Sequence, residues 1–233
     1  MKLSSIRELD ETGSTNDDLA ALAAAGAAEG TWVRADRQSG GRGRQGRVWQ
    51  SPAGNLYAST LVRLAPADAP APTLALVAAV ALHEALLLAA PDAPIRIKWP
   101  NDLLAGGAKL GGILLERVAD AVVIGFGVNL VHHPHDLERP TTDLASLSGS
   151  APDAPAFCAT LAEIFSLELS RWRSDGLTPL RARWLSRAHP IGTALATSDG
   201  EGLFDGLDET GALRLRLVDG STRLIHAGDV FLL

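Results

Sequence analysis

The pattern of apolar and polar residues predicts helices in four parts of the chain. Residues 14–30 open with Ser, Thr, Asn and two acidic residues and then become rich in alanine, which predicts a capped helix ending at one of its glycines. Residues 73–90 consist almost entirely of Ala, Leu and Val. Amphipathic periodicity predicts two further helices, at 156–173 and around 180–188.

Between these helices, short apolar or alternating stretches predict strands. The strands are expected at 31–36, 55–64, 95–99, 110–118 and 121–130. Residues 101–109 are expected to form a turn or a hairpin tip, and residues 131–155 a long irregular stretch of the kind that is often functional.

From His189–Pro190 onward the pattern changes to short alternating segments separated by turns rich in Asp and Gly. Such a pattern is typical of a small β-barrel or sandwich. We place a boundary near residues 188–190, and expect a larger domain over residues 1–188 and a small β domain over residues 189–233.

The segment 73–90 is the most apolar in the chain, yet we expect a buried core helix there and no membrane span. Its length is marginal for spanning, and His83 and Glu84 stand near its centre, where a charge in lipid is costly. The first ten residues lack the apolar core of a secretory signal. Cys158 is the single cysteine, which fits a reducing compartment. A cytoplasmic protein is therefore expected.

Composition narrows the class of protein further. The 233 residues are 46% hydrophobic, enough for a sizeable core, and carry a formal net charge of −6. A negative balance argues against non-specific nucleic-acid binding, which depends on cations at phosphates. A local cationic site remains compatible with it.

One segment of the chain is predicted to form such a local cationic site. Residues 40–47, GGRGRQGR, hold four glycines and the arginines 42, 44 and 47. Glycine backbone approaches a ligand closely, and guanidinium groups match phosphate or carboxylate, so the segment predicts an anion cradle. It lacks the Gly-Lys-Ser/Thr of a phosphate-binding P-loop, and its glycines open no helix as a dinucleotide fingerprint would. The alternatives are a flexible solvated loop and an arginine-rich nucleic-acid segment.

Three further segments place polar residues beside strands. Lys98, Asn101 and Asp102 surround Pro100 at a strand end, where they face a cleft or form an Asx turn. Lys109 precedes two glycines and an apolar strand, so it meets an anion or points into water. The glycines of GFGVN, at 125 and 127, leave room for a flat ligand or mark a bulge.

Metal and covalent chemistry are not indicated. His132, His133 and His135 have no convincing set of partner ligands, so no metal site is predicted, and Cys158 is expected to be a core thiol. The chain lacks HExxH, CxxC and a Ser-His-Asp order, so no covalent intermediate on the protein is expected.

Five segments in order resemble the bacterial biotin protein ligases, and the end of the chain resembles their small C-terminal domain. The segments are Ser14–Asn16, Gly41–Arg47 with Trp49, Lys98–Leu103, Lys109–Leu114 and Gly125–Leu130. The resemblance implies an α+β fold, with a catalytic domain like that of class II aminoacyl-tRNA synthetases and a C-terminal SH3-like β-barrel. It also implies that biotin and ATP, with Mg²⁺, form biotinyl-5′-AMP. Biotin then passes to a lysine of the biotin carboxyl carrier protein of acetyl-CoA carboxylase.

The resemblance also implies roles for individual residues. Catalytic roles fall to Lys109, Arg44 and Asp102, the last as an acid near the incoming lysine. Biotin-binding positions are Ser14, Thr15, Asn16, Gln38, Gly41, Arg42, Lys109, Gly112, Leu114 and Gly125. Adenylate-binding positions are Arg42, Gly43, Arg44, Arg47, Trp49, Asn101, Lys109 and Asn129.

The chain departs from the family pattern at few places. Gln45 stands where arginine is common, and Phe126 stands where small residues are also found, so it is expected to reshape the pocket wall. Because the motifs begin at Ser14, we expect a monofunctional ligase without an N-terminal DNA-binding domain; a homodimer is possible. The alternatives are a lipoate or octanoate ligase of the same fold and a non-catalytic biotin- or nucleotide-binding module.

Overall fold

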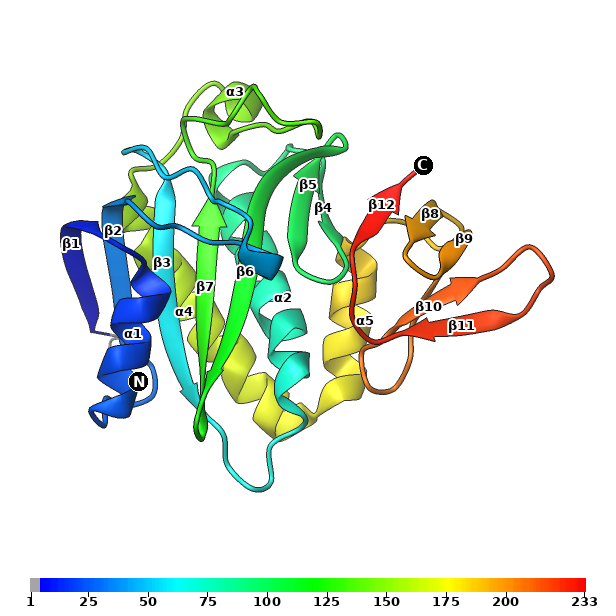
Figure 1. Cartoon of the computed structure of the whole chain (residues 1–233), viewed down its shortest axis with the longest axis horizontal. Helices are drawn as coiled ribbons and strands as arrows, with labels where there is room; N and C mark the ends of the chain where they lie inside the picture. The colour runs from blue at the N-terminus through cyan, green and yellow to red at the C-terminus, as the bar shows by residue number, and fades with distance from the viewer. Residues whose placement is uncertain (1–4) are drawn as a thin grey trace.

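The computed structural model describes residues 5–233, and most of its strands form one mixed sheet (Figure 1). The strands of this sheet are β1 (Ile6–Thr12), β2 (Trp32–Gln38), β3 (Leu56–Arg63), β4 (Ile95–Lys98), β5 (Asp102–Ala105), β6 (Ala108–Val118) and β7 (Ala121–Val128). Their order across the sheet is β1-β2-β3-β7-β6-β5-β4. β1 pairs with β2 in parallel, and the other neighbours are antiparallel.

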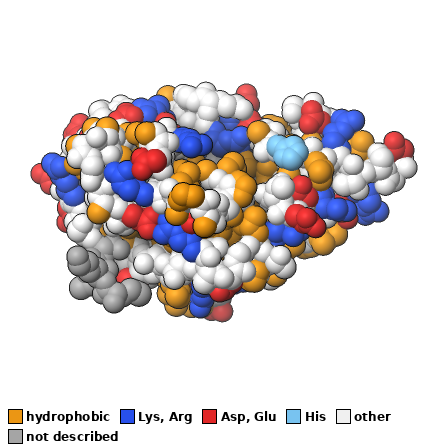
Figure 2. Space-filling view, turned by 90° about the horizontal axis from the view of Figure 1, so that it is seen from below, with side chains coloured by type: hydrophobic (Ala, Val, Ile, Leu, Met, Phe, Trp, Pro, Cys, Tyr) orange, Lys and Arg blue, Asp and Glu red, His pale blue; other side chains and the backbone are white. Residues whose placement is uncertain are grey.

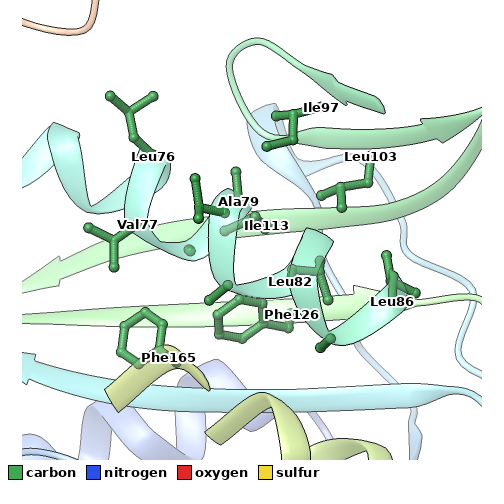
Figure 3. Packing of buried hydrophobic residues seen from close by; sticks show 14 of the residues in the cluster. Leu76, Val77, Ala79, Leu82, Leu86, Ile97, Leu103, Ile113, Phe126 and Phe165 are labelled. Atoms are coloured by element: carbon green, nitrogen blue, oxygen red, sulfur yellow. The ribbon is translucent and has the colours of Figure 1, made fainter. Parts of the chain in front are cut away.

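Helices cover the two faces of this sheet unequally. Helix α1 (Thr15–Ala24) packs on one face, where Leu19 meets Val33 and Val123. Helices α2 (Leu74–Ala89) and α4 (Ala154–Asp175) pack on the other, where Leu82, Phe126 and Phe165 meet (Figures 1 and 3). Successive strand residues point to opposite faces, so alternate residues of β7 feed the two cores.

Helix α2 is the buried core helix predicted from the sequence. Residues 71–89 are long and apolar enough to cross a membrane by length and composition alone, but 67% of that window is buried inside the protein. His83 contacts the Ile95 carbonyl at 3.2 Å, and burial lowers its pKa to about 4, so the ring is neutral at pH 7. Glu84 pairs with Arg187 of α5 (Leu177–Arg187) at 2.5 Å. Both polar residues therefore find partners within the protein.

The C-terminal residues form the small β domain predicted there, an antiparallel second sheet. Its strands are β8 (Ala194–Thr197), β9 (Gly200–Leu207), β10 (Leu213–Arg216), β11 (Thr222–Ile225) and β12 (Val230–Leu232), in the order β11-β10-β9-β8-β12. Phe204 packs edge-on against Trp184 of α5, with ring centroids 6.4 Å apart. The two sheets thus share one hydrophobic core. The division into two domains near residues 188–190 stays a prediction.

Four sequence-based expectations need correction. Asp102–Ala105 is strand β5, and only Gly106 and Gly107, both with positive φ, form the turn. Within 131–155 there is a short helix, α3 (Leu144–Ser148), whose first turn donates to the Asp143 carboxylate. Ser14 precedes α1 without a side-chain capping bond. Strand β1 was not predicted, because most of its side chains are polar and lie at an exposed sheet edge.

The surface carries both signs of charge. On the face shown in Figure 2, basic and acidic side chains are interspersed, and hydrophobic side chains gather between them. This mixture agrees with the modest net charge of −6.

Candidate active site

A cavity of about 660 Å³ lies on the α1 face of the main sheet, above strands β6 and β7. It is bounded by the N-terminus of α1, the Gly/Arg loop, the irregular loop after β7 and the start of β12. Residues from these segments and strands line it: Ser14, Thr15, Asn16, Gln38, Arg42, Gly43, Arg44, Arg47, Val48, Trp49, Gln50, Lys98, Pro100, Asn101, Asp102, Lys109, Gly112, Ile113, Leu114, Gly125, Phe126, Gly127, Asn129, Pro134, Asp136, Leu137, Glu138, Arg139, Thr141, Asp229 and Val230.

Every site residue predicted from the sequence lines this cavity except Gly41. Gly41 is buried beneath the loop, where a Cβ would stand 2.6 Å from Ser51 Oγ and 2.9 Å from Gln38 Nε2. The position therefore requires glycine for packing of the loop, and the contact of its backbone with biotin stays a prediction. From the sequence, Lys98 and the loop at 134–141 were noted without an assigned role, and the C-terminal pair Asp229 and Val230 was missed.

Glycines on the pocket face of β6 and β7 create the space. Gly112 and Gly125 lie on this face, whereas Ile113 and Phe126 belong to the core on the other. The Trp49 indole lies on Gly127, where a Cβ would come within 2.6 Å of the ring. Side chains at these glycine positions would fill the cavity floor.

Phe126 borders the cavity but its ring packs in the core, so the expectation that it reshapes the pocket wall stays a prediction. Its ring stacks on Trp32 at 5.6 Å between centroids and meets Phe165 edge-on at 6.0 Å. Gln45 has a positive φ of 57° and accepts a hydrogen bond from Arg47 at 2.8 Å. It therefore shapes the loop without adding a cation.

A β-bulge turns Lys109 toward the cavity. Leu103 pairs with Gly111 but Leu104 pairs with Lys109, so β6 has one extra residue, Leu110. Leu110 lies in the core, and a Cβ on Gly111 would also point toward it, 3.7 Å from Leu82. Two successive residues thus face the core, which moves Lys109 to the same face as Gly112.

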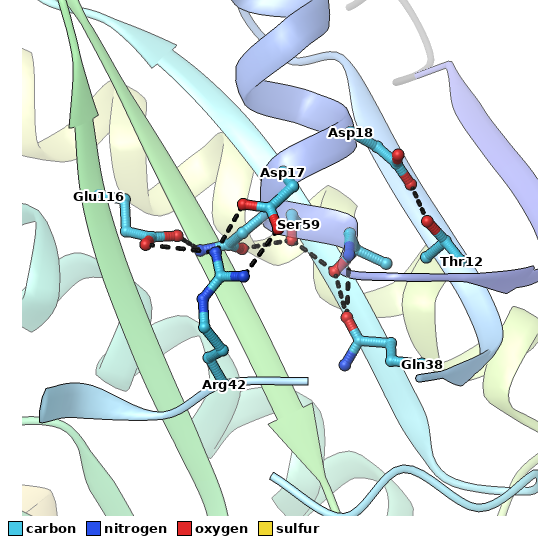
Figure 4. Close-up of polar contacts among 9 residues, drawn as sticks. Thr12, Asp17, Asp18, Gln38, Arg42, Ser59 and Glu116 are labelled. Atoms are coloured by element: carbon cyan, nitrogen blue, oxygen red, sulfur yellow. Dashed lines mark hydrogen bonds and ion pairs between the residues drawn. The ribbon is translucent and has the colours of Figure 1, made fainter. Parts of the chain in front are cut away.

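One end of the cavity is a network of neutral polar groups. Gln38 Oε1 accepts from the Thr15 backbone N–H at 2.9 Å and from its hydroxyl at 3.1 Å. Ser59 lies 2.7 Å from the same hydroxyl and donates to Asn16 Oδ1 at 2.6 Å. Asn16 in turn donates to Glu116 at 2.6 Å (Figure 4). The network fixes donors and acceptors where α1 begins.

Arg42 is bound to carboxylates beside this network. Its two terminal nitrogens donate to the two oxygens of Asp17 at 2.7 and 2.5 Å, and Glu116 lies 3.7 Å away (Figure 4). The hydrogen bond from Arg42 holds the pKa of Asp17 below its usual value. The Arg42 charge is therefore largely balanced before any ligand arrives.

The opposite end of the cavity is rich in cations, which contact the start of β12. Arg44 donates to the Gly228 carbonyl at 3.1 Å and approaches Asn101 Oδ1 at 3.4 Å. Arg47 forms an ion pair with Asp229, which lowers the pKa of that carboxyl. Arg44 forms no ion pair among the described residues 5–233, so its charge is available to an anion.

Asp102 lies between two lysines. Lys109 Nζ is 2.7 Å from Asp102 Oδ1, and Lys98 Nζ is 3.3 Å from Oδ2. Burial opposes ionisation of Asp102 most strongly, but attraction by Lys109 and Lys98 outweighs it and holds the pKa below the usual 3.8. Asp102 is therefore a carboxylate at neutral pH, and the group of three has a surplus of positive charge.

Two amides connect the strands of the cavity to neighbouring loops. Asn101 donates to the Ile113 carbonyl at 2.8 Å, and Asn129 donates to the Thr142 carbonyl at 3.0 Å. The loop after β7 also bonds directly to β6, because the Thr142 backbone N–H donates to the Lys109 carbonyl at 3.0 Å and the Lys109 N–H donates to the Pro140 carbonyl at 2.8 Å. The cavity walls are thus tied to the bulge that carries Lys109.

Comparisons with known proteins identify the family of the chain. Residues 11–129 match the biotin/lipoate A/B protein ligase family, and residues 197–233 match the biotin protein ligase C terminal domain. The chain is 38% identical to the biotin--[acetyl-CoA-carboxylase] ligase of Paracoccus denitrificans, over 96% of this chain and 98% of that one. It is 36% identical to the Mycobacterium tuberculosis protein of the same name, over 96% and 88%.

A solved structure gives the same result. The biotin protein ligase from Aquifex aeolicus, in complex with biotin and ATP, superimposes with a TM-score of 0.88 at 26% identity, covering 98% of this chain and 99% of that one. Sequence and architecture agree over nearly the whole length, so this chain belongs to the biotin/lipoate A/B protein ligase family.

Proposed function

We propose that the chain is an ATP-dependent biotin protein ligase that makes biotinyl-5′-AMP and then transfers biotin to a lysine of the biotin carboxyl carrier protein of acetyl-CoA carboxylase. One observation carries the proposal: a single cavity joins a neutral polar network at one end to a group of cations at the other. The names of the relatives that cover nearly the whole chain support it.

The polar end suits the ureido ring of biotin. A ureido group is uncharged and both donates and accepts hydrogen bonds, so it needs paired neutral groups. Thr15, Gln38 and Asn16 supply them and are already held by Ser59 and Glu116. Gly112 and Gly125 leave space for the fused rings, and Leu114 adds an apolar wall.

The cationic end suits the first reaction. A carboxylate oxygen of biotin attacks the α-phosphorus of ATP, and the bond to the bridging oxygen breaks as pyrophosphate leaves with the electron pair. Two anions must meet, so cations that offset their repulsion lower the barrier. We assign Lys109 to the reacting groups, Arg44 to the phosphate, and Trp49, Asn101 and Asn129 to the adenylate site; all five line the cavity.

The second reaction joins the acyl carbon to the acceptor lysine. The neutral amine attacks this carbon, and the bond to the adenylate oxygen breaks as AMP leaves. Because two lysines hold the pKa of Asp102 low, its carboxylate is a weak base at neutral pH. We therefore propose that Asp102 orients the incoming amine and that solvent accepts the proton that the lysine loses.

The residues around the cavity do not form a dedicated cage for Mg²⁺. No group of three His, Cys, Asp or Glu side chains gathers in the part of the chain that the structure describes. Asp102 and Asp229 are held by lysines and Arg47. Mg²⁺ typically binds through nucleotide phosphates with few protein ligands. We propose that it arrives with ATP.

Gly125→Ala is expected to weaken biotin binding selectively. A methyl group at this position overlaps Asn16 Oδ1, so Asn16 must leave the bonds that hold it in the network. Losing about one hydrogen bond, or about 0.5–1.5 kcal/mol, raises the KM for biotin by roughly 2- to 10-fold and leaves the KM for ATP unchanged. Steady-state kinetics measures both constants. Gly13→Ala, which meets no atom within 4 Å, is the control; an unchanged biotin KM in Gly125→Ala contradicts the assignment.

The decisive test is biotin-dependent exchange of labelled pyrophosphate into ATP, with lipoate and octanoate as controls. Exchange with biotin alone is expected, because the network at Thr15 and Gln38 offers the neutral donors and acceptors that a ureido ring requires. Exchange with lipoate or octanoate reassigns the pocket within the same family, whose description covers lipoate as well. No exchange with any acid supports a non-catalytic binding module.

Three expectations from the sequence stay predictions. They are the cytoplasmic location, the lack of DNA binding and a possible homodimer. The outer edge of β1 is the exposed sheet edge at which a second copy would pair. Analytical ultracentrifugation tests the dimer directly.

A further inference from the structure

Lys98 is a buried cation that the proposed reaction does not use. It ends strand β4, and 9% of its surface is exposed. Its Nζ donates to the Val230 carbonyl at 2.7 Å and lies 3.3 Å from Asp102 Oδ2. A buried ammonium group is retained at a cost unless its partners are well placed, so its position calls for a reason.

Asp102 connects Lys98 to the second lysine of the cavity. Lys109 binds Oδ1 at 2.7 Å, so the carboxylate joins the two lysines. A carboxylate with one partner can rotate about its side-chain bonds. Here the second oxygen is held by Lys98, and Lys98 is held by the backbone of β12. The result is a chain of contacts from the C-terminal sheet to the cation that faces the cavity.

We propose that Lys98 is a positioning residue that fixes Asp102, and through it Lys109, in the orientation needed for adenylate formation. This role rests on the proposed function, in which Lys109 acts on the reacting groups. The C-terminal sheet thereby contributes to the first half-reaction through the Val230 carbonyl, without a side chain in contact with the substrate.

Charge strengthens this arrangement. Lys98, Lys109 and Arg47 act on Asp102, whereas Asp102, Lys109 and Arg139 act on Lys98. Burial lowers the pKa of Lys98, and its attraction to Asp102 opposes that effect. Because Lys98 helps to hold the pKa of Asp102 low, its removal raises that pKa. The acidic limb of the pH–rate profile then moves to higher pH.

The test compares three variants of the full chain by biotin-dependent pyrophosphate exchange. Lys98→Met is expected to lower kcat by about 10- to 100-fold, the size of effect that a small misplacement of a reacting group produces. The KM for biotin stays within about twofold of the wild-type value, because Lys98 makes no contact that binds ground state and transition state equally. Lys98→Arg, which keeps the charge, recovers part of the rate and restores the acidic limb.

Lys98→Gln separates charge from hydrogen bonding. It retains a donor for the Val230 carbonyl, so it carries the test where the methionine variant does not fold. A reduced kcat with a shifted acidic limb is expected from it. Arg96→Met, at an exposed position of the same strand, is the control.

Two results overturn the proposal. One is that the folded Lys98→Gln enzyme has the kcat and the acidic limb of the wild type. Lys98 would then be only structural, even if the melting temperature of the variant is lower. The other is a rise in the biotin KM with kcat unchanged. The wild-type exchange rate tests the proposed function separately, because the role of Lys98 is judged from the ratio of variant to wild type.

Discussion

Lys109→Met is expected to slow the formation of biotinyl-5′-AMP by about 10²- to 10³-fold, the cost of removing one well-placed electrostatic contact in a transition state. The methionine keeps the aliphatic stem beside Gly112, so only the charge is lost. The fold tolerates the change because Asp102 keeps Lys98 as its partner. The rate of transfer from preformed biotinyl-5′-AMP falls much less, because in that step a neutral amine is the attacking group and no two anions have to meet.

Rapid-quench kinetics with labelled ATP measures the first half-reaction, and biotin transfer to carrier protein from synthetic adenylate measures the second. Arg117→Met removes a cation from an exposed position of the same strand and serves as the control. An equal loss in both half-reactions refutes the assignment of Lys109 to adenylate formation.

Arg44→Ala is expected to release the adenylate roughly 10- to 150-fold faster, because a hydrogen bond to a charged group contributes about 1.5–3 kcal/mol. In the ligand-free protein Arg44 is held by the Gly228 carbonyl and Asn101. These contacts are neutral, so a phosphate competes with them favourably. The free energy of unfolding changes little, because Arg44 pairs with no carboxylate of the described residues and its removal therefore leaves no charge unpaired.

The dissociation rate of labelled adenylate, followed by filter binding, measures this effect, and thermal unfolding measures the stability. Arg216→Ala, an exposed arginine of β10 outside the cavity lining, is the control. A dissociation rate that matches the wild type would mean that Arg44 does not hold the phosphate.

Features that depend on local sequence patterns could be predicted from the sequence. Apolar or alternating stretches predicted the inner strands, a continuous Ala/Leu run predicted α2, and helical periodicity predicted α4. The glycines at 112, 125 and 127 were noticed because glycine weakens a strand interior and so needs a reason. The structure provides that reason: they form the floor of the cavity.

The remaining features depend on contacts between distant residues. The bulge at Leu110 is decided by the register between β5 and β6, and no local pattern distinguishes it from a regular strand. Lys98 and Val230 are 132 residues apart, so nothing near either one indicates their contact. The arginines of the Gly/Arg loop look equivalent in sequence, but folding gives Arg42 and Arg47 carboxylate partners and leaves Arg44 neutral ones.

The shared core of the two sheets has a consequence for how the molecule comes apart. Trp184 of the larger part packs against Phe204 of the smaller one, and both are almost fully buried. If either part opened alone, it would expose the apolar side chains that the other covers. The two sheets therefore unfold as one cooperative unit, and a change at Phe204, which does not line the catalytic cavity, alters the stability of the fold that holds it.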